Sequence, residues 1–120
     1  IVPGFNGTQR PPKCIGMNKA KEILFTGKML TAADALELGI LNHVTEPEQL
    51  MDEVYAMAKQ IADNSASAIS LVKAAVNAGA DMDIDIGKNI ELGYMAACFG
   101  TPDQIEGFNS FKEKRAAKFG

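Results

Sequence analysis

The chain has 120 residues, of which 47% are hydrophobic and 22% charged, and its formal net charge is −3. A chain of this length can bury one modest core. Its slightly acidic balance offers no positive field to a nucleic acid. Charged or polar residues interrupt every apolar run before the roughly 20 residues that a membrane-spanning helix needs. These features argue against nucleic acid and membrane as partners and favour one helical unit.

The cysteines and the first residue bear on the compartment. Cys14 and Cys98 form neither a CxxC pair nor a disulfide framework, which is typical of reduced thiols. The chain begins at Ile1 rather than Met, and its first residues lack the apolar region of a signal peptide. We therefore expect part of a longer protein, located in the cytoplasm or, in a eukaryote, in the mitochondrial matrix.

The first half of the chain predicts a loop followed by short helices. Residues 1–16 are rich in proline and glycine and predict a loop, in which Gly4, Asn6 and Gly7 can adopt positive φ. A helix is expected from a cap near Asn18 to Gly27, and another from a Thr31–Asp34 capping box to Gly39. Residues 40–44 leave room for only a connector or a brief strand.

The second half predicts four helices. One covers 47–62, with a buried apolar stripe and a capping box of Thr45 and Glu48. The next ends at Gly79, and another begins near Asp85 and contains two glycines that suggest close helix packing. Residues 101–104 (Thr-Pro-Asp-Gln) give the strongest helix start in the chain. Three aromatic residues are expected in the core: Phe99, Phe108 and Phe111.

Sites that are readable from local motifs are few. Residues 81–87 resemble a calcium loop, but the glycine is one position late and Leu92 stands where a bidentate Glu is required, so we reject calcium. His43 has no Cys or Asp at ligand spacing and is interpreted as a connector residue, and no metal site is predicted. Four glutamates are interpreted as helix surface, because nothing in their spacing joins two of them at one pocket: Glu22, Glu37, Glu91 and Glu106.

Four segments in register resemble one known family. Residues 1–10 are similar to the Pro-Gly loop of the crotonase (enoyl-CoA hydratase/isomerase) family, which ends in Gly-Gly-Thr-Gln-Arg. Residues 19–27 are similar to its Lys-Ala-x-Glu segment that ends in Thr-Gly, and residues 33–42 to its Glu-Ala segment that leads into Gly-Leu-Val-Asn. Residues 99–115 are similar to its Asp-Gln-x-Glu-Gly segment that ends in Glu-Lys-Arg. The resemblance covers nearly the whole chain and is nearest to the short-chain enoyl-CoA hydratases.

The resemblance implies a fold for this chain and places the catalytic residues outside it. The chain would be mainly all-α, the C-terminal helical domain of the ClpP/crotonase fold, with the β/α superhelical core upstream. Residues 1–16 would be the loop that joins this core, and residues 17–120 the helical domain that packs in a trimer or hexamer. The family's two catalytic glutamates and its oxyanion N–H groups would lie before Ile1, so no catalytic residue is expected here. Coenzyme A would be part of the acyl-CoA substrate, with no separate cofactor.

The resemblance also implies substrate contacts. Pro3, Gly4 and Phe5 would border the acyl pocket, although a Gly/Pro-rich loop is by itself most often a linker. Met95 stands near the expected adenine position, where methionine keeps an apolar contact without stacking. Lys114 would reach the nucleotide end of coenzyme A, where a cation suits the phosphates. A solvated basic helix end explains Lys114 equally well.

Two departures from the family pattern fall in or after the loop. Asn6 replaces the first glycine of the usual pair, and Asn tolerates left-handed geometry. Pro11 replaces a leucine, and Pro11-Pro12 removes two backbone donors, which could shift the start of the next helix.

Three functions remain open from the sequence. The leading one is part of a hydratase that adds water to trans-2-enoyl-CoA, or removes it from 3-hydroxyacyl-CoA, in fatty acid or butyrate metabolism, with this segment serving assembly and coenzyme A enclosure and inactive alone. The second is another acyl-CoA enzyme of the same family, an isomerase, thioesterase or decarboxylase. The third is a non-catalytic helical interaction module.

Overall fold

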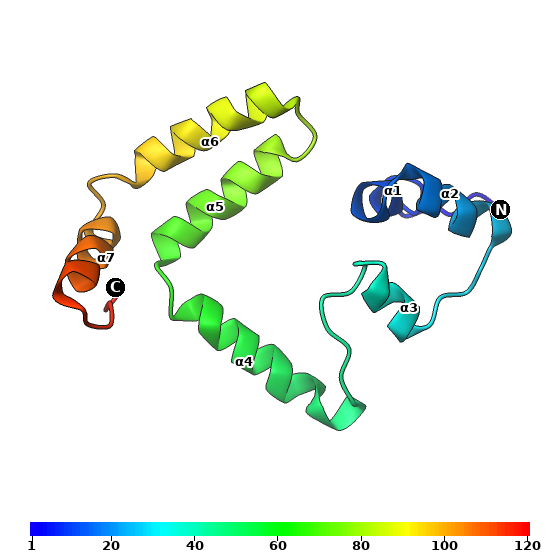
Figure 1. Cartoon of the computed structure of the whole chain (residues 1–120), viewed down its shortest axis with the longest axis horizontal. Helices are drawn as coiled ribbons and strands as arrows, with labels where there is room; N and C mark the ends of the chain where they lie inside the picture. Colours follow the sequence, from blue (N-terminus) through cyan, green and yellow to red (C-terminus); the bar gives the residue numbers. More distant parts are fainter. The chain divides into compact units, whose positions relative to one another are not determined.

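The computed structural model describes residues 1–120 and contains helices but no strand (Figure 1). The chain divides into two compact units, residues 1–50 and residues 51–120. The helical content agrees with the mainly all-α fold that the sequence predicts. None of the helices is long and apolar enough to cross a membrane.

The first unit contains three short α-helices and a 3-10 turn. The helices are α1 (Arg10–Ile15), α2 (Met17–Thr26) and α3 (Ala32–Glu37), and the turn η1 covers Pro47–Gln49. Gly27 ends α2 in the left-handed region, with φ 66°, and donates its N–H to Ile23 O. The Thr31–Asp34 capping box begins α3, with Asp34 N–H donating to Thr31 Oγ1 over 3.1 Å. These stops and caps agree with the sequence prediction.

The second unit contains α5 (Ala66–Gly79), α6 (Ile84–Cys98) and α7 (Pro102–Glu113), and most of α4 (Leu50–Ala62). Helices α5 and α6 lie side by side and run in opposite directions (Figure 1). They approach closely near their connection, where a Cβ on Gly79 would lie 3.7 Å from Gly87 Cα. A Cβ on Gly93 would meet nothing within 4 Å, so only one of the two α6 glycines is at the close approach.

Helix α7 begins as the sequence predicts. Thr101 Oγ1 accepts the Gln104 N–H over 3.2 Å, and Pro102 occupies the first turn. Asp103 fastens this start to α5, because Ser65 Oγ and Ser67 Oγ donate to Asp103 Oδ2 over 2.6 and 3.1 Å. Ser65 Oγ also accepts the Ala68 N–H and so caps α5.

One stretch of the expected loop is helical, and two predicted helix caps are absent. Helix α2 begins at Met17 with Gly16 as its N-cap residue, so Asn18 does not cap it. Residues 10–15 form α1 inside the expected loop, because Pro11 and Pro12 occupy the first turn, where the N–H groups that proline lacks have no partner in a helix. The predicted capping box of Thr45 and Glu48 is absent. Glu46 is the N-cap residue of η1, without a side-chain cap, and Pro47 starts this 3-10 turn directly before α4.

The predicted burial is also wrong. Ala20 is the only buried apolar residue, and the buried polar residues are Ser65 and Ser110. Phe99, Phe108 and Phe111 are exposed rather than core, Phe111 to 85%. The apolar stripe of α4 is exposed as well, namely Leu50, Val54, Met57 and Ile61. The helical periodicity correctly identified apolar faces, and the side chains named above are exposed on them.

Candidate functional site

The Pro-Gly loop contains two consecutive left-handed residues. Phe5 has φ 52° and Asn6 has φ 68°, whereas Gly4 and Gly7 are not among the residues with positive φ. The left-handed region is uncommon for a bulky side chain, and the Phe5 side chain is fully exposed. The loop closes through Gly7 N–H, which donates to Gly4 O over 3.0 Å. Asn6 therefore takes the geometry that the sequence predicts, and Phe5 is the unexpected strained residue.

Position 7 requires glycine because a side chain there would collide with Pro3, and not because of a positive φ angle. A Cβ at this position would lie 2.9 Å from Pro3 Cβ and 3.1 Å from Pro3 O. The loop thus folds back so that Pro3 and Gly7 touch, with Gly4 and Phe5 at the turn. This geometry presents the Phe5 side chain outward.

Met95 lies in an apolar pocket of about 240 Å³ on the α5–α6 pair. The residues that line it are Ala68, Leu71, Val72, Ala75, Glu91, Tyr94, Met95 and Cys98. Glu91 is the only charged residue among them, so the pocket suits an apolar or aromatic group. Lys114 does not line it.

Lys114 marks the reversal of the chain at the end of α7. It is left-handed, with φ 54° and ψ 41°, and donates its N–H to Phe111 O over 3.2 Å. Its ammonium forms no ion pair, although Arg115 next to it pairs with Glu106 and Glu113. A free cation at an exposed chain reversal is available to an anionic ligand.

Glu106 organises the residues after Lys114. Arg115 Nη1 and Nη2 donate to the two Glu106 oxygens over 2.6 and 2.9 Å, and Lys118 N–H donates to Glu106 Oε1 over 2.7 Å. The Arg115 side chain, followed by the Lys118 backbone N–H, lowers the pKa of Glu106 to about 2. Glu106 is thus a charged residue that holds the segment after α7, rather than the plain surface residue that the sequence interpretation expected.

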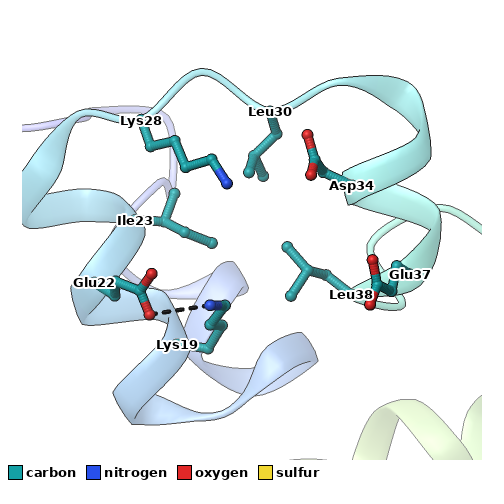
Figure 2. A pocket seen from close by; sticks show the side chains of 8 residues that line it. All are labelled: Lys19, Glu22, Ile23, Lys28, Leu30, Asp34, Glu37 and Leu38. Carbon is teal, nitrogen blue, oxygen red and sulfur yellow. Dashed lines mark hydrogen bonds and ion pairs between the residues drawn. The ribbon is translucent and has the colours of Figure 1, made fainter.

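A second pocket, of about 210 Å³, lies between α2 and α3 (Figure 2). Glu22 from α2 and Glu37 from α3 both line it, although the sequence interpretation found no shared pocket for them, because the 28–30 connection turns the chain back. Glu22 accepts a hydrogen bond from Lys19 Nζ over 3.0 Å. Asp34 in the same pocket accepts from Thr31, and these hydrogen bonds lower its pKa. Two of the three carboxylates are therefore already engaged.

Metal-ligating side chains do not gather anywhere in the chain. No group of three His, Cys, Asp or Glu residues is placed to hold an ion. Cys14 and Cys98 are both free thiols. His43 lies in the connector between α3 and η1.

The predicted substrate residues fall into both units. Pro3, Gly4 and Phe5 share one loop of the first unit, and Met95 and Lys114 belong to different helix ends of the second. Sequence reasoning missed Glu106 and Arg115, although opposite charges on either side of a predicted helix end are a signal for such a pair.

Comparison with known proteins decides the family. The family described as "Enoyl-CoA hydratase/isomerase" matches residues 1–120, the whole chain. The chain belongs to the enoyl-CoA hydratase/isomerase family.

Several proteins similar to this chain are named hydratases. The chain is 43% identical over 119 residues to a crotonyl-CoA hydratase of Syntrophomonas wolfei, covering 99% of this chain and 46% of that protein. It is 45% identical over 112 residues to a short-chain-enoyl-CoA hydratase of Clostridioides difficile, covering 93% of this chain and 72% of that protein. The crystal structure of the enoyl-CoA hydratase from Bacillus anthracis matches with a TM-score of 0.93 at 35% identity, over 99% of this chain and 46% of that one. The chain thus spans about half the length of two of these enoyl-CoA hydratases.

Proposed function

We propose that this chain is the C-terminal helical part of an enoyl-CoA hydratase that adds water to short trans-2-enoyl-CoA substrates or catalyses the reverse dehydration. The observation that carries the proposal is the similarity to hydratases along the whole chain, 43% identity over 119 residues in the Syntrophomonas wolfei protein. The exposed apolar faces support an assembly role, because large exposed apolar patches mark protein interfaces.

In this proposal the chain supplies binding and assembly, and the catalytic carboxylates come from residues before Ile1. The Pro3–Gly7 loop borders the acyl group, Met95 offers an apolar surface to the adenine, and Lys114 binds phosphate oxygens of coenzyme A. Coenzyme A belongs to the substrate, and the assembled protein is a trimer or hexamer located in the cytoplasm or the mitochondrial matrix. The unpaired Lys114 ammonium and the apolar pocket at Met95 suit these two roles.

Hydration of crotonyl-CoA tests the proposal. The full-length protein should lower the absorbance of the conjugated thioester, and the purified 120-residue chain should give no rate above the uncatalysed reaction. Hydration by the chain alone would overturn the division of roles. Turnover of a 3-enoyl-CoA without hydration by the full-length protein would instead favour an isomerase, the other activity in the family's description.

The state of the isolated chain tests the assembly role. Sedimentation velocity should show self-association, because the apolar faces of α4 to α7 lack a covering partner. A compact, stable monomer would favour an independent helical interaction module.

A further inference from the structure

The chain after α7 folds back along the helix that precedes it. Beyond the reversal at Lys114, Lys118 N–H donates to Glu106, and a Cβ on Gly107 would lie 3.8 Å from the Phe119 ring. The C terminus accordingly lies beside α7 (Figure 1). The tail is therefore held against the middle of α7.

The reversal itself is built on an unfavourable residue. The position after a helix that adopts left-handed geometry is usually glycine, because a Cβ disfavours that region. Here it is Lys114, with φ 54°. Arg115 N–H donates to Ser110 O over 3.0 Å and completes the turn. Fixing the flanks of this lysine from outside the turn offsets part of the cost of its left-handed conformation.

Glu106 supplies that fixation on the far side of the turn. Both of its oxygens are used by Arg115, and one of them also accepts from Lys118 N–H. Paired, charge-assisted hydrogen bonds of this kind hold geometry more firmly than a single contact. Lys114 is left as the residue of this turn whose ammonium has no partner.

We propose that Glu106 is a positioning residue for Lys114: by holding Arg115 and the Lys118 backbone, it fixes the left-handed turn that presents the Lys114 ammonium to the phosphates of coenzyme A. This inference rests on the proposed function, in which Lys114 binds those phosphates. Glu106 itself does not contact the ligand.

Coenzyme A affinity in a double-mutant cycle tests the inference. In the full-length protein, Lys114→Ala should weaken coenzyme A binding about tenfold, the loss of one charged hydrogen bond. Glu106→Gln, which keeps the shape but loses the charge, should weaken it about threefold, and kcat should stay within about twofold of the wild-type value. In the Lys114→Ala background, Glu106→Gln should have no further effect, because there is no ammonium left to position.

Matched variants separate the turn from the charge. Lys114→Gly keeps the left-handed turn and removes the ammonium, so it should match Lys114→Ala. Lys112→Ala and Glu53→Gln remove a neighbouring basic charge and a distant acidic one, and should leave affinity unchanged. If circular dichroism shows that Glu106→Gln is unfolded, Arg115→Lys, which breaks the paired hydrogen bonds, takes its place with the same expected results.

Each outcome decides between the two ideas. If Lys114→Ala weakens binding and Glu106→Gln does not, the positioning role is wrong and the coenzyme A role of Lys114 stands. An equal effect of Glu106→Gln with and without Lys114 also overturns the positioning role. Unchanged affinity in both Lys114 variants overturns the role of Lys114 in the proposed function, and the inference with it.

Discussion

Gly7 is the residue whose side chain the Pro-Gly loop excludes most directly. A methyl group there would lie 2.9 Å from Pro3 Cβ, closer than real side chains approach. We expect Gly7→Ala to open the loop and to lower the unfolding free energy of the full-length protein by about 1 kcal/mol, as strained substitutions do. Urea denaturation measures this. Gly4→Ala is the control, because its methyl group would meet nothing within 4 Å; equal losses in both variants would show that the close approach is unimportant.

Glu106 gives the protein a stability contribution that depends on pH. Its pKa falls from 4.5 to about 2 in the folded chain, mainly through Arg115, so unfolding takes up a proton at acidic pH. The contribution is complete above about pH 4.5 and is lost as the pH falls towards 2. The urea midpoint of the wild type should exceed that of Glu106→Gln by a constant amount between pH 7 and 5.

The difference between these midpoints should then shrink from pH 5 to pH 3. This direction follows because the Glu106 carboxyl of the unfolded wild type takes up a proton below about pH 4.5 while that of the folded chain stays charged, which favours the unfolded state. A difference that grows on acidification would contradict the assignment.

At the scale of elements, Ser65 and Asp103 join the starts of α5 and α7. Ser65 is buried, donates to Asp103 over 2.6 Å and accepts the Ala68 N–H, so one hydroxyl serves both a cap and a link between helices. Ser65→Ala should lower the unfolding free energy by about 1–2 kcal/mol, the usual loss for a helix cap. Asp103→Asn should cost less, because an amide oxygen can still accept a hydrogen bond.

The double variant separates the two roles of Ser65. If the link is real, the losses of Ser65→Ala and Asp103→Asn should not add, since they share one hydrogen bond. Ser70→Ala, at an exposed position of α5, is the control and should be neutral or slightly stabilising. Strict additivity in chemical denaturation would mean that the two helix starts are stabilised independently.

Local chemistry explains which elements the sequence could predict. The Thr31–Asp34 and Thr101–Gln104 starts and the Gly27 stop depend on residues within one helical turn, and the structure has all three. The start of α1 was missed because Pro11 and Pro12 indicate a loop and a first helical turn equally well. Local sequence patterns therefore predict a helix end only where the residues there are compatible with one structure and not with two.

The candidate site was predictable only residue by residue. The resemblance identified Met95 and Lys114 as single residues. The pocket around Met95 exists only because α5 lies beside α6. The pairing of Arg115 with Glu106 requires the chain to reverse at Lys114. The presence of Glu22 and Glu37 in one pocket depends likewise on a turn between their helices. Residues from different helices come to line one site through the tertiary structure, which the spacing of residues along a single helix does not predict.

At the scale of the molecule, burial was the feature that the sequence predicted worst. Apolar periodicity identifies a face that must be covered, but it does not say whether the same chain covers it. Phe108 is 64% exposed and Val72 58%, although each lies in an apolar pattern. The chain spans 46% of the length of the Syntrophomonas wolfei hydratase, so more than half of that protein is available to provide such a cover.

A charge placed in the apolar pocket of α5 and α6 tests whether this face is covered in the full-length protein. Val72 lines the pocket next to Met95 and is 58% exposed in the chain. In the isolated chain, Val72→Glu should leave helicity unchanged and reduce self-association, because the new carboxylate stays in water. In the full-length protein Val72→Glu should lower the unfolding free energy by about 3 kcal/mol or more, because an unpaired charge would be enclosed by apolar side chains.

Sedimentation velocity and urea denaturation of both proteins measure this difference, with Ser70→Glu as the exposed control on the same helix. An equally small effect of Val72→Glu in both proteins would mean that the pocket stays open to solvent, and coenzyme A would then be its only remaining occupant in the proposed function.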